Sequence, residues 1–128
     1  ELISMLLLQN ITPVFSANTH DGNGQLLNTN ADTIASEIAI SLSNAFDVNL
    51  IYCFEKKGVL SNSEDEASVI EEINFEKYSI LKEQKIIHSG MLPKLENCFK
   101  SLSNGVQNII IGNQNVLKNS TIHTKIKL

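Results

Sequence analysis

The chain has 128 residues, 42% hydrophobic and 19% charged, which is the composition of one globular domain that can bury its own core. The longest apolar runs, residues 5–8 and 109–111, are too short to span a bilayer, and no signal-peptide pattern opens the sequence. The net charge of −4 argues against general binding to nucleic acid or to a membrane surface. All 10 basic residues are lysines, so any arginine clamp for phosphate or carboxylate must come from elsewhere.

The first 30 residues predict a helix, a strand and a tight turn. Residues 1–9 are typical of the end of a helix that begins without a capping residue, which suggests that the chain starts in mid-fold. Residues 11–17 have the character of a strand. Asp-Gly and Asn-Gly follow each other within residues 19–24, and they predict a hairpin-like turn that leads into a short strand over residues 25–27.

The middle of the chain predicts a helix followed by a buried strand. Between residues 33 and 46, apolar side chains recur at steps of three and four, which indicates one face of an amphipathic helix. Residues 48–54 are apolar except for Asn49, as in a central strand buried on both faces. Since open parallel sheets bind ligands at the carboxyl ends of their strands, the loop over residues 55–58 is a candidate binding segment.

The next segment predicts a loop, a short strand and a second helix. Residues 61–68 are polar and acidic, as in a solvent-exposed loop. Residues 69–73 have the character of a short strand, and apolar positions over residues 75–82 fit a helix.

The end of the chain predicts a third helix and two strands. Residues 89–104 carry a regular apolar face, and Gly105 ends this helix as a C′ residue does. Residues 109–112 predict a buried strand, and residues 122–128 alternate as a half-buried or edge strand does. This order of elements predicts an α/β fold, a three-layer sandwich with a mainly parallel sheet, formed as a single domain over residues 1–128.

The cysteines and histidines predict neither a disulfide framework nor a metal site. Cys53 in an apolar run and Cys98 on a helix face are expected to be reduced core thiols, as in a cytoplasmic protein. His20, His88 and His123 are scattered, with no cysteine or carboxylate at ligand spacing. We therefore expect no metal held by protein ligands alone.

A polar cluster at residues 89–94 opens the third predicted helix. Ser89 can cap this helix, and Gly90 lets another group approach the backbone closely. Lys94 lies near unpaired backbone N–H groups and the positive end of the helix dipole, where the dipole alone disfavours a cation. This geometry suits a nucleotide phosphate; the alternative is an ordinary solvated lysine.

A second polar cluster, residues 28–32, opens the first amphipathic helix. If this stretch is extended, Asn28, Asn30 and Asp32 project to the same side. The two amides can donate hydrogen bonds to a carboxylate, whereas Asp32 needs a cationic partner, which must be a lysine in this chain. The alternative is that Asn30 or Asp32 simply caps the helix.

Taken in order, these motifs resemble those of a known family. They are Asn-x-Asn-Ala-Asp at residues 28–32, a hydrophobic strand with a Gly-Val-Leu turn at residues 50–60, and Gly-Met-x-x-Lys at residues 90–94. The combination resembles the acetylglutamate kinases of the amino acid kinase family, over roughly residues 11–111. The resemblance implies the nucleotide-binding half of the amino acid kinase fold.

The resemblance also implies a reaction and the residues that serve it. The reaction is ATP-dependent phosphorylation of the side-chain carboxylate of an N-acyl-L-glutamate, with Mg²⁺ brought by the nucleotide. Asn28 and Asn30 would bind the acylglutamate, Asp32 would position the catalytic lysines, and Lys94 would stabilise charge on the transferring phosphoryl group. The residues implied for the nucleotide are Glu55, Lys56, Lys57, Gly58, Val59, Leu60, Ile86, Ile87, His88 and Gly90.

The chain also departs from the family pattern. Phe54-Glu55 stands where the family has Thr-Asp or Ser-Asp, so the carboxylate is displaced by one methylene. Members of the family are much longer, and their amino-terminal half supplies a second catalytic lysine, glycine-rich loops and an arginine for the substrate. We therefore expect this chain to be the carboxyl-terminal portion of a larger cytoplasmic, homo-oligomeric kinase, and to be inactive alone.

Two alternatives stay open. One is another amino acid kinase, acting on aspartate, carbamate or a nucleoside monophosphate. The other is a regulatory domain that binds a nucleotide or metabolite without turnover. The amide pair Asn28 and Asn30 favours an amino-acid carboxylate over the other acceptors, and a glycine-rich, lysine-containing segment upstream of Glu1 would favour the kinase over the regulatory domain.

Overall fold

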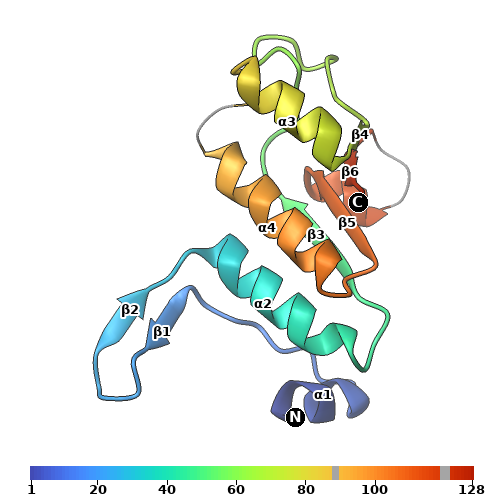
Figure 1. The fold of residues 1–128 in the computed structure, drawn as a ribbon. Coiled ribbons are helices and arrows are strands. Elements are labelled where there is room, and N and C mark those ends of the chain that lie inside the picture. The colour runs from blue at the N-terminus through green and yellow to red at the C-terminus, as the bar shows by residue number, and fades with distance from the viewer. Residues whose placement is uncertain (88–89, 119–121) are drawn as a thin grey trace.

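The computed structural model describes residues 1–87, 90–118 and 122–128 (Figure 1). Among these residues, no helix is long and apolar enough to cross a membrane. The elements in chain order are α1 (Leu2–Leu8), β1 (Asn18–His20), β2 (Leu26–Asn28), α2 (Ala31–Ser43), β3 (Asn49–Cys53), β4 (Glu72–Ile73), α3 (Phe75–Glu83), α4 (Met91–Ser103), β5 (Asn108–Gly112), the 3₁₀ helix η1 (Gln114–Lys118) and β6 (Thr124–Ile126).

Within the described part of the chain, the main sheet has four strands in the order β3-β5-β6-β4. The pairs β3 with β5 and β4 with β6 are parallel, and only the central pair, β5 with β6, is antiparallel. These pairings confirm the predicted α/β fold with a mainly parallel sheet. The helices cover the sheet with α4 in the middle, flanked by α2 and α3 (Figure 1).

One face of the sheet is buried against these helices. Leu50 of β3 pairs with Ile109 of β5, which pairs with Ile126 of β6, and all three are buried. On the opposite face, Ile51 and Ile110 form the equivalent row and are only half-buried. The helical layer and the sheet are thus two of the three layers that the sequence predicts.

The helix α4 supplies the centre of the core. Leu95, Cys98 and Phe99 recur at steps of three and one along α4, and all three are buried. The centroid of the Phe99 ring lies 5.3 Å from that of the Tyr78 ring on α3. This aromatic contact packs α4 against α3. Gly105 follows α4 with a φ of +96°, as predicted for the residue that ends this helix.

The predicted turn near the amino terminus is present as a hairpin. β1 and β2 pair antiparallel with Asn18 opposite Asn28, and the hairpin extends away from α2 (Figure 1). The carboxylate of Asp21 accepts hydrogen bonds from the backbone N–H groups of Asn23 and Gln25, which lower the pKa of Asp21. Gly24 closes the turn with a φ of +98°, a conformation that favours glycine.

Two strand predictions need correction. Residues 11–17 form no strand: Pro13 has no N–H to donate, and Val14 is 93% exposed. The strand over residues 48–54 is not buried on both faces. Leu50 and Tyr52 point to the face that the helices cover and are buried, whereas Ile51 points to the opposite face and is half-buried. In the described sheet β3 is also an edge strand, not a central one.

One further expectation fails, and the structure decides between the two alternatives of another. Cys53 is exposed rather than a core thiol, because it ends the edge strand β3, whereas Cys98 is buried as predicted. β6 keeps the predicted alternation but is not an edge strand, since it lies between β5 and β4. Within this strand Ile126 is buried, while Ile122 before it and Leu128 after it are exposed.

Candidate active site

An ion pair joins the two polar clusters singled out in the sequence. Lys94, the fourth residue of α4, places its Nζ 2.6 Å from Oδ1 of Asp32, the second residue of α2. The side chains are 13% and 30% exposed, respectively. Because the pair is largely shielded from water, its attraction is stronger than that of a surface ion pair. The structure thus gives Asp32 the lysine partner that the sequence required.

A tyrosine that the sequence analysis missed lies against this pair. Nζ of Lys94 lies 4.6 Å from the centroid of the Tyr52 ring. The Tyr52 hydroxyl donates a hydrogen bond to the backbone carbonyl of Asp32 at 3.1 Å. The alternation of β3, which turns Tyr52 to the buried face together with Leu50, could have indicated that this side chain faces the helices.

Two buried serines form hydrogen bonds that lead from the Tyr52 hydroxyl into the core. Ser36 Oγ lies 2.8 Å from the Tyr52 hydroxyl, and Ser101 donates to Ser36 Oγ at 3.0 Å. All three side chains are buried, and the bonds satisfy hydroxyls that would otherwise be costly to bury. Burial raises the pKa of Tyr52 to about 12, so the phenol is neutral at physiological pH.

The polar cluster at residues 28–32 is not extended throughout. The helix α2 begins at Ala31, so Asp32 lies in its first turn instead of alternating with the two asparagines. Asn30 is the N-cap, and its Oδ1 accepts the backbone N–H of Thr33 at 3.1 Å. Asn28 is the exposed last residue of β2. Asn30 therefore caps the helix, while Asp32 instead binds Lys94.

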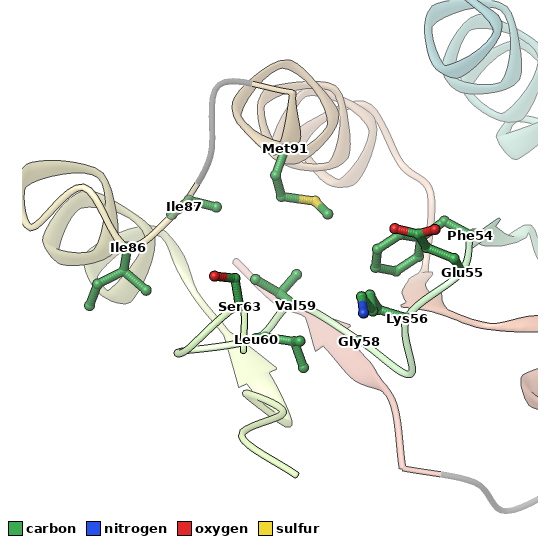
Figure 2. A pocket seen from close by; sticks show the side chains of 10 residues that line it. All are labelled: Phe54, Glu55, Lys56, Gly58, Val59, Leu60, Ser63, Ile86, Ile87 and Met91. Atoms are coloured by element: carbon green, nitrogen blue, oxygen red, sulfur yellow. The ribbon is translucent and has the colours of Figure 1, made fainter. Parts of the chain in front are cut away.

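A cavity of about 300 Å³ lies where the nucleotide residues were predicted (Figure 2). Met91 of α4 and Val59 face each other across it, and Glu55 and Lys56 lie together at one end (Figure 2). The residues that line it are Phe54, Glu55, Lys56, Gly58, Val59, Leu60, Ser63, Ile86, Ile87 and Met91.

Seven of the predicted nucleotide residues line this cavity, and two further described ones do not. Lys57 is exposed and is not part of the lining. Gly90 also lies outside it, with open space around its Cα: an added Cβ would meet no atom within 4 Å. His88 is outside the described residues, and so is Ser89, which was predicted to cap α4. The N-cap of α4 is Gly90, without a side-chain hydrogen bond. Phe54, Ser63 and Met91 are lining residues that the sequence analysis did not assign to the nucleotide.

A second hollow of about 350 Å³ adjoins the first at the carboxyl ends of the parallel strands β3 and β5. Both hollows include Phe54 and Glu55, and the second adds the side chains of Asn113, Gln114 and Asn115. This is the edge of the sheet at which open α/β folds bind ligands.

The loop that forms the cavity wall is held against β6. Thr124 accepts the backbone N–H of Val59 at 2.8 Å and donates to the carbonyl of Ile70 at 2.7 Å. Gly58 allows this approach, because a Cβ there would lie 2.6 Å from Oγ1 of Thr124. The preference for glycine here comes from close packing and not from backbone strain.

The acidic loop also contacts the cavity. Glu66 accepts a hydrogen bond from Lys56 at 3.0 Å, and this contact raises the pKa of Lys56. The predicted loop character of residues 61–68 is otherwise confirmed, since most of its residues are exposed. Among the described residues, no cluster of three histidine, cysteine, aspartate or glutamate side chains could hold a metal ion.

Known proteins resemble this chain in sequence. An acetylglutamate kinase of Cytophaga hutchinsonii is 52% identical over 94% of this chain and 48% of its own length. One of Bacteroides thetaiotaomicron is 45% identical over 98% of this chain and 49% of its own. The chain thus spans about half the length of the curated relatives it matches.

Solved structures agree with these matches. The protein smu.665 of Streptococcus mutans is 30% identical and superposes with a TM-score of 0.80, over 98% of this chain and 46% of its own. N-acetylglutamate synthase of Neisseria gonorrhoeae has the same TM-score at 18% identity, covering 98% of this chain and 30% of its own, and shows likeness of fold alone. The profile of the amino acid kinase family matches residues 1–113. The resemblance first indicated by the ordered motifs is therefore confirmed: the chain belongs to the amino acid kinase family.

Proposed function

We propose that this chain is the nucleotide-binding portion of an acetylglutamate kinase, which transfers the γ-phosphoryl group of ATP to the side-chain carboxylate of an N-acyl-L-glutamate. The observation that carries the proposal is the shielded Lys94–Asp32 pair at the start of α4. The same helix start contributes Met91 to the adjacent cavity. A fixed cation beside a nucleotide-sized hollow is what phosphoryl transfer requires.

In this proposal the two members of the ion pair have separate roles. A carboxylate oxygen of the acylglutamate attacks the γ-phosphorus, the bond to the β-phosphate oxygen breaks, and ADP leaves. Lys94 stabilises the negative charge that develops on the transferring group. Asp32 fixes the position of the ammonium before the reaction, so little reorganisation is needed as that charge appears.

The cavity suits the other end of the nucleotide. Val59, Ile87 and Met91 offer apolar contacts for a flat base, while Glu55 and Lys56 offer polar partners. ATP carries Mg²⁺ bound to its phosphates, and this needs no all-protein cage. Lys57 and Gly90 remain part of the proposed nucleotide site as residues outside the wall. His88 remains part of it because of the family resemblance.

The asparagines are proposed to bind the acylglutamate. Capping uses Oδ1 of Asn30, so the Nδ2 hydrogens of the same amide can donate to the substrate's α-carboxylate. Asn28 is two residues away at the end of β2, where its side chain is exposed. Backbone N–H groups at the start of α2 add to the attraction for a carboxylate.

The chain is proposed to act within a longer cytoplasmic, homo-oligomeric kinase. An apolar groove of about 360 Å³ runs between residues 15–17, one face of α2 and the edge strand β3. Large apolar side chains are also exposed throughout the first 30 residues: Leu2, Met5, Leu8, Ile11, Val14, Phe15, Leu26 and Leu27. Further polypeptide of the kinase would cover this surface, and the chain alone would be inactive.

The test is a substrate panel on the full-length protein. With MgATP, we expect acyl phosphate formation from N-acetyl-L-glutamate, trapped as the hydroxamate, and much less from aspartate, carbamate or a nucleoside monophosphate. The isolated chain, assayed in parallel, should give no product. ATP binding without turnover of any acceptor would favour the regulatory domain and contradict the proposal, as would equal activity of the isolated chain.

A further inference from the structure

We propose that Tyr52 is a positioning residue for the phosphoryl-transfer lysine: the face of its ring and its hydroxyl together hold Lys94 and Asp32 in place. The inference rests on the proposed function, since it assigns Tyr52 to the same site. Tyr52 itself would not touch the transferring group; it would act through the lysine.

The ring of Tyr52 lies against the ammonium group of Lys94. Tyr52 is 4% exposed, and its ring centroid lies 4.6 Å from Nζ of Lys94. An ammonium group is attracted to the negative face of an aromatic ring, and more strongly when water is excluded. The Lys94 ammonium is therefore held on one side by the Asp32 carboxylate at 2.6 Å and on another by this ring.

The hydroxyl of Tyr52 contacts Asp32 and Ser36. It donates to the backbone carbonyl of Asp32 at 3.1 Å, and because it has a single hydrogen, Ser36 must donate to it at 2.8 Å. Ser101 in turn donates to Ser36. Tyr52 thus contacts both members of the ion pair, and buried serines from α2 and α4 fix its own orientation.

This arrangement has a consequence for the reaction. A lysine ammonium is carried on a flexible four-carbon stem, and Asp32 alone fixes only its distance from one carboxylate. Catalytic groups need their geometry restricted by supporting contacts. Removing the ring should therefore weaken stabilisation of the transition state with little effect on substrate binding, so that kcat falls while KM changes little.

The chain contains a matched control. Nζ of Lys82 lies 5.5 Å from the ring of Tyr78, and Tyr78 is 5% exposed, close to the value for Tyr52. The Lys82 side chain is 51% exposed and pairs with Glu96 instead of Asp32. Tyr78→Leu thus removes an equally buried ring that contacts a lysine, but outside the proposed site.

The kinetic test uses the full-length protein with N-acetyl-L-glutamate and MgATP. We expect Tyr52→Leu to lower kcat about 10-fold, the factor that a shielded cation–π contact is worth, with KM changed less than about twofold. Tyr52→Phe keeps the ring and should lose no more than about threefold. Tyr78→Leu should lower thermal stability comparably to Tyr52→Leu but leave kcat unchanged. The inference is overturned if Tyr52→Leu keeps the wild-type kcat, if Tyr52→Phe loses as much, or if Tyr78→Leu lowers kcat equally.

A second measurement reports the contact without activity. Lysines are labelled by reductive ¹³C-methylation, and the Lys94 methyl resonance is assigned by its absence in Lys94→Arg. The Tyr52 ring should shift this resonance upfield, Tyr52→Phe should keep the shift, and Tyr52→Leu should abolish it. An unshifted wild-type resonance would overturn the inference even in an active kinase. Conversely, a wild-type protein that does not turn over N-acetyl-L-glutamate would refute the proposed function, while the resonance would still test the ring contact.

Discussion

Thr124 offers the clearest way to disturb the proposed nucleotide cavity without altering its shape. This side chain is 0% exposed, and its hydroxyl joins the cavity residue Val59 on one side to Ile70 on the other. The substitution Thr124→Val keeps the branched shape but removes both hydrogen bonds. The backbone N–H of Val59, which is itself buried, then loses its partner.

The expected cost follows from these two bonds. Each buried donor or acceptor that loses its partner costs about 1–3 kcal/mol, so Thr124→Val, which leaves two such groups, should lower the free energy of unfolding by about 2–6 kcal/mol. Thr124→Ser keeps both bonds and removes one methyl group, which should cost about 1 kcal/mol. Because Val59 lines the cavity, only the valine variant should also raise KM for ATP, with KM for N-acetyl-L-glutamate unchanged.

The assay combines urea denaturation of the full-length protein, followed by circular dichroism, with steady-state kinetics for each substrate. Equal destabilisation by the two variants would show that the hydrogen bonds do not hold the loop. A valine variant with the predicted loss of stability but wild-type KM for ATP would show that this loop does not contact the nucleotide.

Three further predictions follow. Gly58→Ala should lower the free energy of unfolding by about 1–3 kcal/mol, because its Cβ would lie 3.0 Å from the backbone of β6. Gly90→Ala should change the free energy of unfolding by no more than about 0.5 kcal/mol, and equal values for the two variants in urea titrations would contradict this difference. Cys53 is exposed, whereas Cys98 is buried, and burial raises the pKa of Cys98 to about 12. Ellman's reagent at pH 8 should therefore react with Cys53 at once and with Cys98 only in denaturant. Prompt reaction of both cysteines would be inconsistent with the structure. Burial raises the pKa of Tyr52 from 10.0 to about 12. The stability contributed by the neutral phenol is therefore complete below pH 10 and lost between pH 10 and about 12. Tyr52→Phe should lose less stability than the wild type in that interval, and an identical pH dependence of the two proteins would argue against a buried phenol.

The elements that could be predicted from the sequence are those encoded by local patterns. The apolar repeat of α2, the Asp-Gly and Asn-Gly turn and the glycine after α4 each follow from neighbouring residues, and the structure contains all three. Residues 11–17 were predicted wrongly because a strand needs a partner, and an apolar run does not show whether one is present. For the same reason the sequence did not show that β3 is an edge strand and that Cys53 is exposed.

The candidate site was predicted in part. Lys94 and Asp32 could be paired because Asp32 needed a cation and the motifs resembled a family that has both. Tyr52 could not be placed beneath them, since its contact with Lys94 depends on how α4 crosses β3, which no local spacing encodes. The capping role of Asn30 was a stated alternative, but only the start of α2 at Ala31 decides it.

The proposed phosphoryl transfer depends most on Lys94, and replacing this residue with alanine in the full-length protein tests that dependence directly. Lys100 is the matched control, because it joins the same two helices through Glu37 at 2.5 Å, on a more exposed part of their surface. With N-acetyl-L-glutamate and MgATP, Lys94→Ala should lower kcat by about 100- to 1000-fold, as expected for one lost transition-state donor, while Lys100→Ala stays within about twofold of wild type. A Lys94→Ala enzyme that turns over at nearly the wild-type rate would contradict the account.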